Sequence, residues 1–182
     1  MRGSATILML VVAAIAAGAL PARAAQRRFF SFDPADAATR AAAGALTFEF
    51  DQHLFSTHVI AIRATEGEAT ADLQHVGEAS LGPGGLDHAA GGHTDDRDLY
   101  RIKPDKEGGA MVSALCPGAK EGWVALPRIR ADRDLVMLVI GRNAGGAAHL
   151  CHRLAFTFHG EWRLPPGPGV NPNSVPQPHF PY

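Results

Sequence analysis

Two histidines in a predicted β-hairpin are spaced to share a ligand. The runs 58–64 and 69–76 flank Glu66-Gly67, which is typical of a hairpin turn although weaker than Asn-Gly. This turn predicts three opposed pairs: Ile62 with Ala71, Ile60 with Leu73, and His58 with His75. Because opposed Cβ atoms lie about 4.5–5.5 Å apart, the two imidazoles could bind Zn²⁺ or Cu²⁺ weakly, or repel each other when protonated below about pH 6.5. The alternative is two polar residues that meet solvent at the open end of the hairpin, since no third ligand is evident.

A glycine-rich segment, residues 79–98, offers a second set of polar side chains. It holds His88 and His93 with three acidic neighbours, Asp87, Asp95 and Asp96. Histidine and aspartate are sensible metal ligands, but glycine does not preorganise them, and ordering costs roughly 1–2 kcal/mol per residue. We interpret the segment mainly as a mobile connector, with a substrate or metal loop as the alternative.

The two cysteines, Cys116 and Cys151, predict a disulfide. In an oxidising compartment two thiols in one small domain usually pair, and closing a loop of about 35 residues stabilises the fold by roughly 3–4 kcal/mol. A thiolate metal site is the competing interpretation, because His149 and His152 flank Cys151. Structural zinc sites need four ligands, often with C-x2-C spacing, and Cys116 has no such partner nearby. Two free thiols are the third alternative.

Nucleophilic catalysis has little support in the sequence. No serine lies in G-x-S-x-G, and the H-E-x-x-H, Walker A and dinucleotide-binding patterns are absent. His152 shares its alternation face with apolar residues, which is more typical of a partly buried histidine than of a catalytic base. We therefore expect no cofactor and no identifiable catalytic residue. A small hydrolase that uses loop histidines and aspartates stays an alternative.

The first 24 residues have the organisation of a secretory signal peptide. Arg2 supplies the positive start, 7–20 is an apolar run, and Ala22-Arg23-Ala24 follows Pro21 as a small-x-small cleavage site. The run is shorter than the about 20 residues needed to span a bilayer. We expect cleavage after Ala24, and a periplasmic or secreted protein.

Composition limits the kinds of partner that the mature chain can bind. Removing Arg2 and Arg23 from 17 basic residues leaves 15 against 18 acidic ones, a net charge of about −3. The basic residues are scattered, so we expect no nucleic-acid partner. No second apolar stretch has membrane length, so no integral membrane segment is expected after cleavage. Abundant alanine, and arginine in excess of lysine, are typical of a GC-rich bacterial genome.

Alternating apolar and polar residues predict a mostly β-protein. A short helix is expected at 33–43, with Asp33 as N-cap, Pro34 in the first turn and Gly44 at its end. Eight short strands, separated by turn signals, favour an antiparallel β-sandwich or a partly open barrel. The expected strands are 46–50, 58–64, 69–76, 98–103, 110–115, 123–129, 135–140 and 150–158. The run 135–140 is apolar on both faces, so it should be covered on both sides.

These elements define one domain, residues 25–164, after the signal peptide 1–24. Residues 165–182 are rich in proline, which predicts an extended tail that either stays disordered or lies along the domain. We expect a non-enzymatic binding or envelope-associated module whose partner is an unknown protein or small ligand. The alternatives are the small hydrolase and a weak metal-binding protein that uses His58 with His75.

Overall fold

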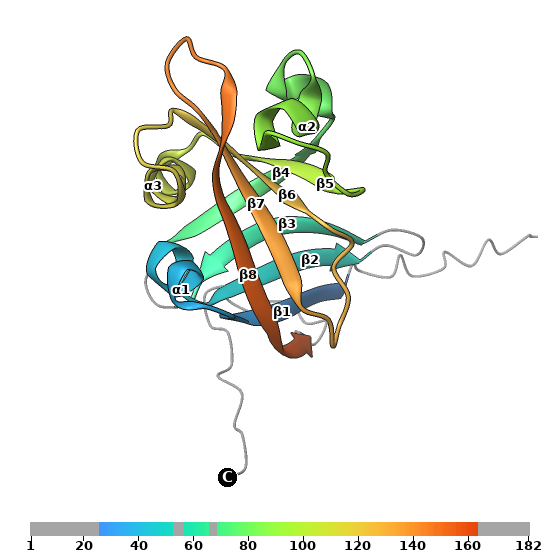
Figure 1. Ribbon diagram of the computed structural model, residues 1–182. Coiled ribbons are helices and arrows are strands. Elements are labelled where there is room, and N and C mark those ends of the chain that lie inside the picture. The colour runs from blue at the N-terminus through green and yellow to red at the C-terminus, as the bar shows by residue number, and fades with distance from the viewer. Residues whose placement is uncertain (1–25, 53–56, 66–68, 164–182) are drawn as a thin grey trace, which may run out of the picture.

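Eight antiparallel strands form a closed barrel (Figure 1). The computed structural model describes residues 26–52, 57–65 and 69–163, so the predicted signal peptide, the turn Glu66-Gly67 and the predicted tail lie outside the described residues. The strands are β1 Gln26–Pro34, β2 Leu46–Gln52, β3 Thr57–Ala64, β4 Thr70–Val76, β5 Asp98–Ile102, β6 Glu121–Leu126, β7 Leu135–Arg142 and β8 Ala148–Arg163. The helices are α1 Ala37–Ala43, the 3-10 helix η1 Glu78–Leu81, α2 Gly85–Ala90 and α3 Lys106–Leu115.

Each strand pairs with the next one along the chain, and β1 closes the barrel by pairing with β8. The predicted antiparallel, eight-stranded, mostly β fold is confirmed, and the barrel is closed rather than partly open. Every described strand therefore has a partner on both sides, although the β3–β4 ladder covers only Ala61–Arg63 and Thr70–Asp72. Among the described residues, no helix has the length and hydropathy of a membrane span.

Phenylalanine side chains dominate the interior of the barrel. Phe32 packs edge-to-face on Phe48, with ring centroids 5.6 Å apart, and Phe30 packs against Phe50 at 4.7 Å. Alternation along the strands sends these residues inward, where they join one apolar cluster with Met137 and residues of the other strands. Side chains therefore fill the interior, as in other small eight-stranded barrels.

A second apolar cluster lies outside the barrel wall and corrects the prediction for residues 79–98. Instead of a connector without structure, this segment forms most of η1 and all of α2, and α2 lies against β8 and β7. The cluster includes Leu81, Leu86, Ala89, Leu99, Trp123, Leu138 and Ile140. Because Leu138 and Ile140 lie here while Met137 and Val139 face the interior, β7 is covered on both sides, as expected.

The predicted strand 110–115 is wrong, because these residues belong to α3. Asp105 caps the helix by accepting a hydrogen bond from the Gly108 N–H at 2.7 Å. Met111, Val112 and Leu115 then face the interior cluster, at helical spacing. Two adjacent glycines made the start of this helix resemble a turn, but Gly108 is needed there since a Cβ would overlap the Lys103 carbonyl oxygen.

The predicted start of the first helix is also wrong. Residues 33 and 34 belong to β1, a strand that the sequence did not predict, and the N-cap of α1 is Asp36. The Asp36 carboxylate accepts the Thr39 N–H at 2.6 Å, and this backbone hydrogen bond lowers the pKa of Asp36. Gly44 ends the helix as predicted, with φ of 63°. Strand pairing on both sides of β1 outweighed the local capping signal of Asp33 and Pro34.

One bulge divides the predicted face of β8. Val139 pairs with His152 and Ile140 pairs with Leu150, so Cys151 is the extra residue. The predicted common face of 150, 152, 154, 156 and 158 is therefore wrong at its first member, because Leu150 packs against the outer cluster. Bulges re-aim side chains, and this one turns Cys151 toward the interior cluster.

Candidate functional site

The hairpin register that brings the two histidines together is confirmed. In the β3–β4 ladder, Ile62 pairs with Ala71, and its neighbours follow the same register. The ladder stops at Ala61, and His58 and His75 lie beyond its end with ring centroids 6.2 Å apart, tilted by 58°. Both side chains are exposed, at the end of the barrel where β3 begins and β4 ends. This end is opposite α1 and α3, which connect strands at the other end.

Asp98 and Tyr100, at the start of β5, complete the group around the histidine pair. Nε2 of His75 lies 3.6 Å from Oδ1 of Asp98, and the His75 ring meets the Tyr100 ring edge-on at 5.3 Å. His75 pairs with Tyr100 across the β4–β5 ladder. The sequence analysis did not place these residues here, because a connection of some twenty residues separates β4 from β5 and sets no register.

The environment of Tyr100 keeps its hydroxyl protonated. The residue is 3% exposed, and desolvation raises the pKa of its phenol. The negative charge of Asp98 raises it further, while a backbone hydrogen bond with Val59 acts in the opposite direction. Tyr100 therefore places a buried, neutral phenol against the exposed ring of His75.

Each histidine of the pair has an acidic residue as a neighbour. Asp51 pairs with His58 across the β2–β3 ladder, whereas Asp98 contacts His75. We call His58, His75 and Asp98 the rim cluster. Imidazole nitrogens and a carboxylate oxygen are ligand types that bind divalent transition-metal ions.

The structure does not bring His88 and His93 together as ligands of one site. Instead, Asp87 holds the loop after α2 by accepting hydrogen bonds from the Thr94 N–H and hydroxyl, both at 2.7 Å, and by pairing with Nδ1 of His93 at 3.1 Å. These bonds lower the pKa of Asp87 to about 2, the Thr94 hydroxyl contributing most. Asp95 and Asp96 are exposed. This polar group serves to shape the loop.

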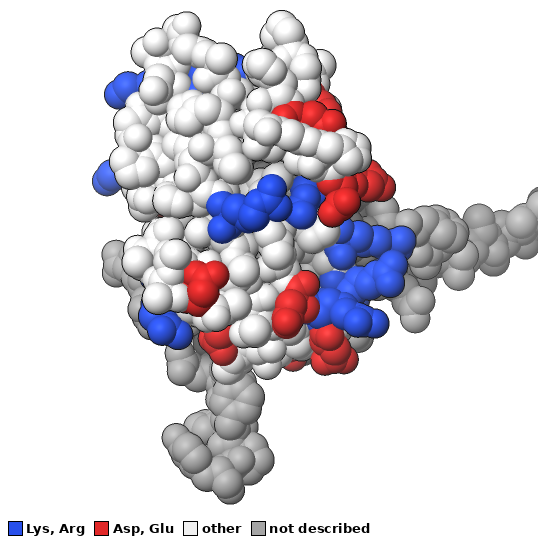
Figure 2. Space-filling view, viewed as in Figure 1, with Lys and Arg blue, Asp and Glu red and all other residues white. Residues whose placement is uncertain are grey.

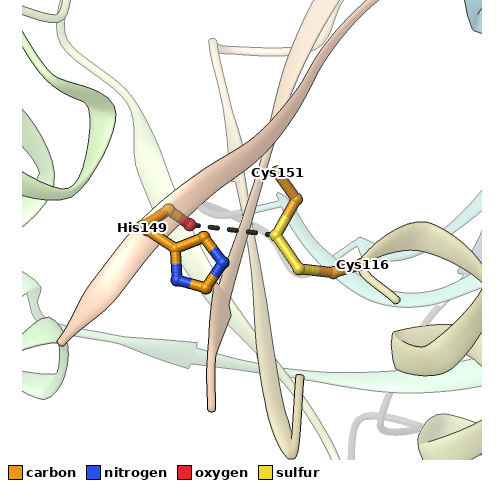
Figure 3. A group of neighbouring side chains, drawn as sticks. All are labelled: Cys116, His149 and Cys151. Atoms are coloured by element: carbon orange, nitrogen blue, oxygen red, sulfur yellow. Dashed lines mark hydrogen bonds between the residues drawn. A yellow bond between two sulfur atoms is a disulfide. The ribbon is translucent and has the colours of Figure 1, made fainter. Parts of the chain in front are cut away.

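Cys116 and Cys151 form the predicted disulfide, which joins the end of α3 to β8. Their Cα atoms are 5.4 Å apart, within the usual range. His149 lies beside them (Figure 3). The two cysteines and His149 form a group of three potential metal ligands, with one ligand atom from each residue and all three atoms within 4.8 Å of one another. His152 is half-buried, inside the bulge, and is not part of this group.

The described serines provide no activated nucleophile. The Ser31 hydroxyl hydrogen-bonds the Thr47 hydroxyl at 2.7 Å, and the Ser113 hydroxyl donates to the Gly109 carbonyl at 2.9 Å. The buried Ser80 hydroxyl has no hydrogen-bond partner. Within the described part of the chain, no serine is thus paired with a histidine, so the hydrolase alternative gains no support from these contacts.

The rim cluster contains side chains that can coordinate a metal ion, but no similar protein is available for comparison. No protein family, curated protein or solved structure matches the chain. The surface gives a general constraint: Figure 2 shows acidic and basic side chains lying next to one another on one face of the barrel, which therefore carries mixed charge.

Proposed function

We propose that this protein is an exported binding module that holds a divalent transition-metal ion at its rim cluster. The observation that carries the proposal is the distance of 6.2 Å between the ring centroids of His58 and His75. Zn–N bonds are about 2.0–2.1 Å long, so two imidazoles that share an ion have centroids about 5–6 Å apart. A small rotation of two exposed rings is enough to bring them into this range.

Asp98 supplies the third ligand in this proposal. Its carboxylate lies 3.6 Å from Nε2 of His75. Two histidines with one carboxylate are a common ligand set for zinc, and a water molecule would fill the remaining position. Because all three side chains are exposed and must be ordered on binding, we expect weak affinity.

The disulfide supports export. A structural disulfide persists in an oxidising compartment, such as the periplasm or the medium. Mass spectrometry of protein recovered from the periplasmic and medium fractions tests this part. We expect an N-terminus at Ala25, and an intact Met1 in soluble protein from the cytosol would contradict it.

Metal binding is tested by titrating the oxidised protein with Zn²⁺ while recording the ring resonances of its histidines. We expect the His58 and His75 signals to shift together and to saturate at one equivalent of bound ion. His58→Ala should abolish saturation, whereas the control His88→Ala, an exposed histidine on α2, should not change it. Unmoved His58 and His75 signals at millimolar Zn²⁺ would refute the proposal.

A further inference from the structure

We propose a second, redox-gated metal site that Cys116, Cys151 and His149 form when the disulfide is reduced. In the oxidised protein, two of the three ligand atoms are the sulfurs that are bonded to each other in the disulfide. After reduction, two thiolates and a neutral imidazole would face the same point, a ligand set that favours Zn²⁺ and related soft divalent ions. The proposal does not depend on the rim cluster.

The ligand atoms are already assembled. The two sulfur atoms and a ring nitrogen of His149 lie within 4.8 Å of one another, and a tetrahedral zinc ion with Zn–S bonds of about 2.3 Å spans such distances. Figure 3 shows the imidazole on the same side of β8 as the two sulfurs. Sγ of Cys151 also lies 3.9 Å from the His149 carbonyl oxygen, so the two residues stay close at their backbones.

Rigid elements hold the three residues after the S–S bond is broken. Cys116 is the C-cap of α3, and its N–H donates to the Val112 carbonyl oxygen at 2.8 Å. Cys151 is the bulged residue of β8, and His149 pairs with Gly141 of β7 in the same ladder. Neither backbone depends on the disulfide alone for its hydrogen bonds. The site would therefore retain its shape better than a flexible loop could.

Gly141 provides the space for the ligands. A Cβ there would overlap Sγ of Cys116 and lie 2.8 Å from Sγ of Cys151. The missing side chain leaves room on the inner face of β7 for two sulfur atoms, in the oxidised or the reduced state.

The gating step is thiol–disulfide exchange with a dithiol reductant. Cys151 is half-buried whereas Cys116 is 2% exposed, so a thiolate of the reductant attacks Sγ of Cys151 and releases the Cys116 thiolate. The second thiol of the reductant then displaces Cys151, and the reductant leaves as a disulfide. Binding a divalent ion removes the remaining thiol protons to solvent. The resulting site, with two thiolates and a neutral histidine, has no net charge.

Cobalt spectroscopy of the whole mature protein tests the proposal. The protein is reduced with dithiothreitol, desalted without oxygen, and titrated with Co²⁺, whose bonds to thiolate produce an intense ultraviolet charge-transfer band. We expect the band to saturate at one equivalent in reduced protein and to be absent in oxidised protein. Histidines and carboxylates cannot produce it, so binding at the rim cluster does not interfere.

Variants of the proposed ligands distinguish a three-ligand site from binding by the two thiols alone. His149→Ala should weaken Co²⁺ binding at least about tenfold, since losing a ligand costs no less than losing an outer-shell partner. His152→Ala, next to Cys151 but outside the group, should leave the affinity unchanged. Cys151→Ser should remove most of the band. Equal effects of the two histidine variants would overturn the proposal, as would loss of the β circular-dichroism spectrum on reduction, because no preformed site would then remain.

Discussion

Gly141 of β7 directly faces Cys116 in the barrel, and the disulfide occupies the volume in which a side chain at Gly141 would lie. The glycine has an ordinary strand conformation, so its role is to make space and not to adopt an unusual backbone angle. The disulfide thus depends on a residue of β7, whereas the cysteines lie at the end of α3 and on β8.

We expect Gly141→Ala to destabilise the oxidised protein by about 1–3 kcal/mol, because overpacking forces β7 and the Cys116 segment apart. Urea denaturation measures the free energy of unfolding. In the Cys116→Ala/Cys151→Ala background, which itself loses roughly 3–4 kcal/mol, both sulfurs are gone and the added methyl should cost less than half as much. An equal penalty in both backgrounds would show that the sulfurs are not what the glycine accommodates.

Glu49 is a buried carboxylate on β2, 2% exposed, that two arginines neutralise. Arg27 lies 2.8 Å and Arg63 lies 2.6 Å from its oxygens. We expect Glu49→Gln to cost about 1–3 kcal/mol in urea denaturation, which is below the usual cost of breaking a buried pair because both arginines are partly solvated.

The matched control for Glu49 is Asp72→Asn, which breaks the exposed pair with Lys103 at 3.0 Å. This change should cost less than about 1 kcal/mol, because both side chains are about half exposed. If the two variants were equally stable, burial of Glu49 would not be energetically important.

The loop after α2 should lose order in acid. The pKa of Asp87 is lowered to about 2 by the hydrogen bonds from Thr94. A lowered folded-state pKa stabilises the loop above the ordinary value of 3.8, and this stabilisation is lost as the pH falls through about 2. The Thr94 amide resonance should therefore titrate with a midpoint of about 2. Thr94→Val should move the midpoint upward, whereas Asp96→Asn should not. A midpoint near 3.8 in the unmodified protein would contradict this.

Tyr100 should titrate in alkali above its ordinary value of 10.0, mainly because it is buried. A raised folded-state pKa means that the stabilisation is fully present below pH 10 and is lost as the pH rises through the raised value. Tyr182→Phe leaves Tyr100 as the single tyrosine, so tyrosinate absorbance reports it directly. Asp98→Asn should lower the midpoint, since a nearby negative charge is removed, but burial should keep it above 10. A midpoint at pH 10 with Asp98 present would show that burial does not raise the pKa of Tyr100.

The β3–β4 register was predictable from sequence because only five residues, 65–69, connect the two strands. A tight hairpin determines which residues face each other, so the Ile62–Ala71 pair followed from the position of Glu66-Gly67 alone. The approach of His58 to His75 followed from the same register. By contrast, Asp98 and Tyr100 reach the site across a long connection, whose length sets no pairing.

The count of eight strands was correct, although one predicted strand was wrong and one observed strand was not predicted. The sequence analysis missed β1 and assigned a strand to 110–115, which belongs to α3, and the two errors cancelled. β1 pairs on both sides, with β2 and β8, and distant pairing of this kind leaves no local signal beyond a short apolar run. Around α3, the adjacent glycines concealed a helix that is stabilised by the Asp105 cap and by the interior cluster.

The sequence by itself determined the β-rich class, the disulfide partners and the local hairpin register. Alternation along short segments predicts strands, two cysteines allow one pairing, and a short connection sets the register of the strands that it joins. Only the tertiary structure decided that the barrel closes through β1 and β8, that Asp98 joins the histidine pair, and that His149 stands beside the disulfide facing the space left by Gly141. The closure depends on strands at opposite ends of the described chain, the Asp98 contact on a long connection that sets no register, and the His149 position on the bulge in β8, and none of these is determined by local residue preferences.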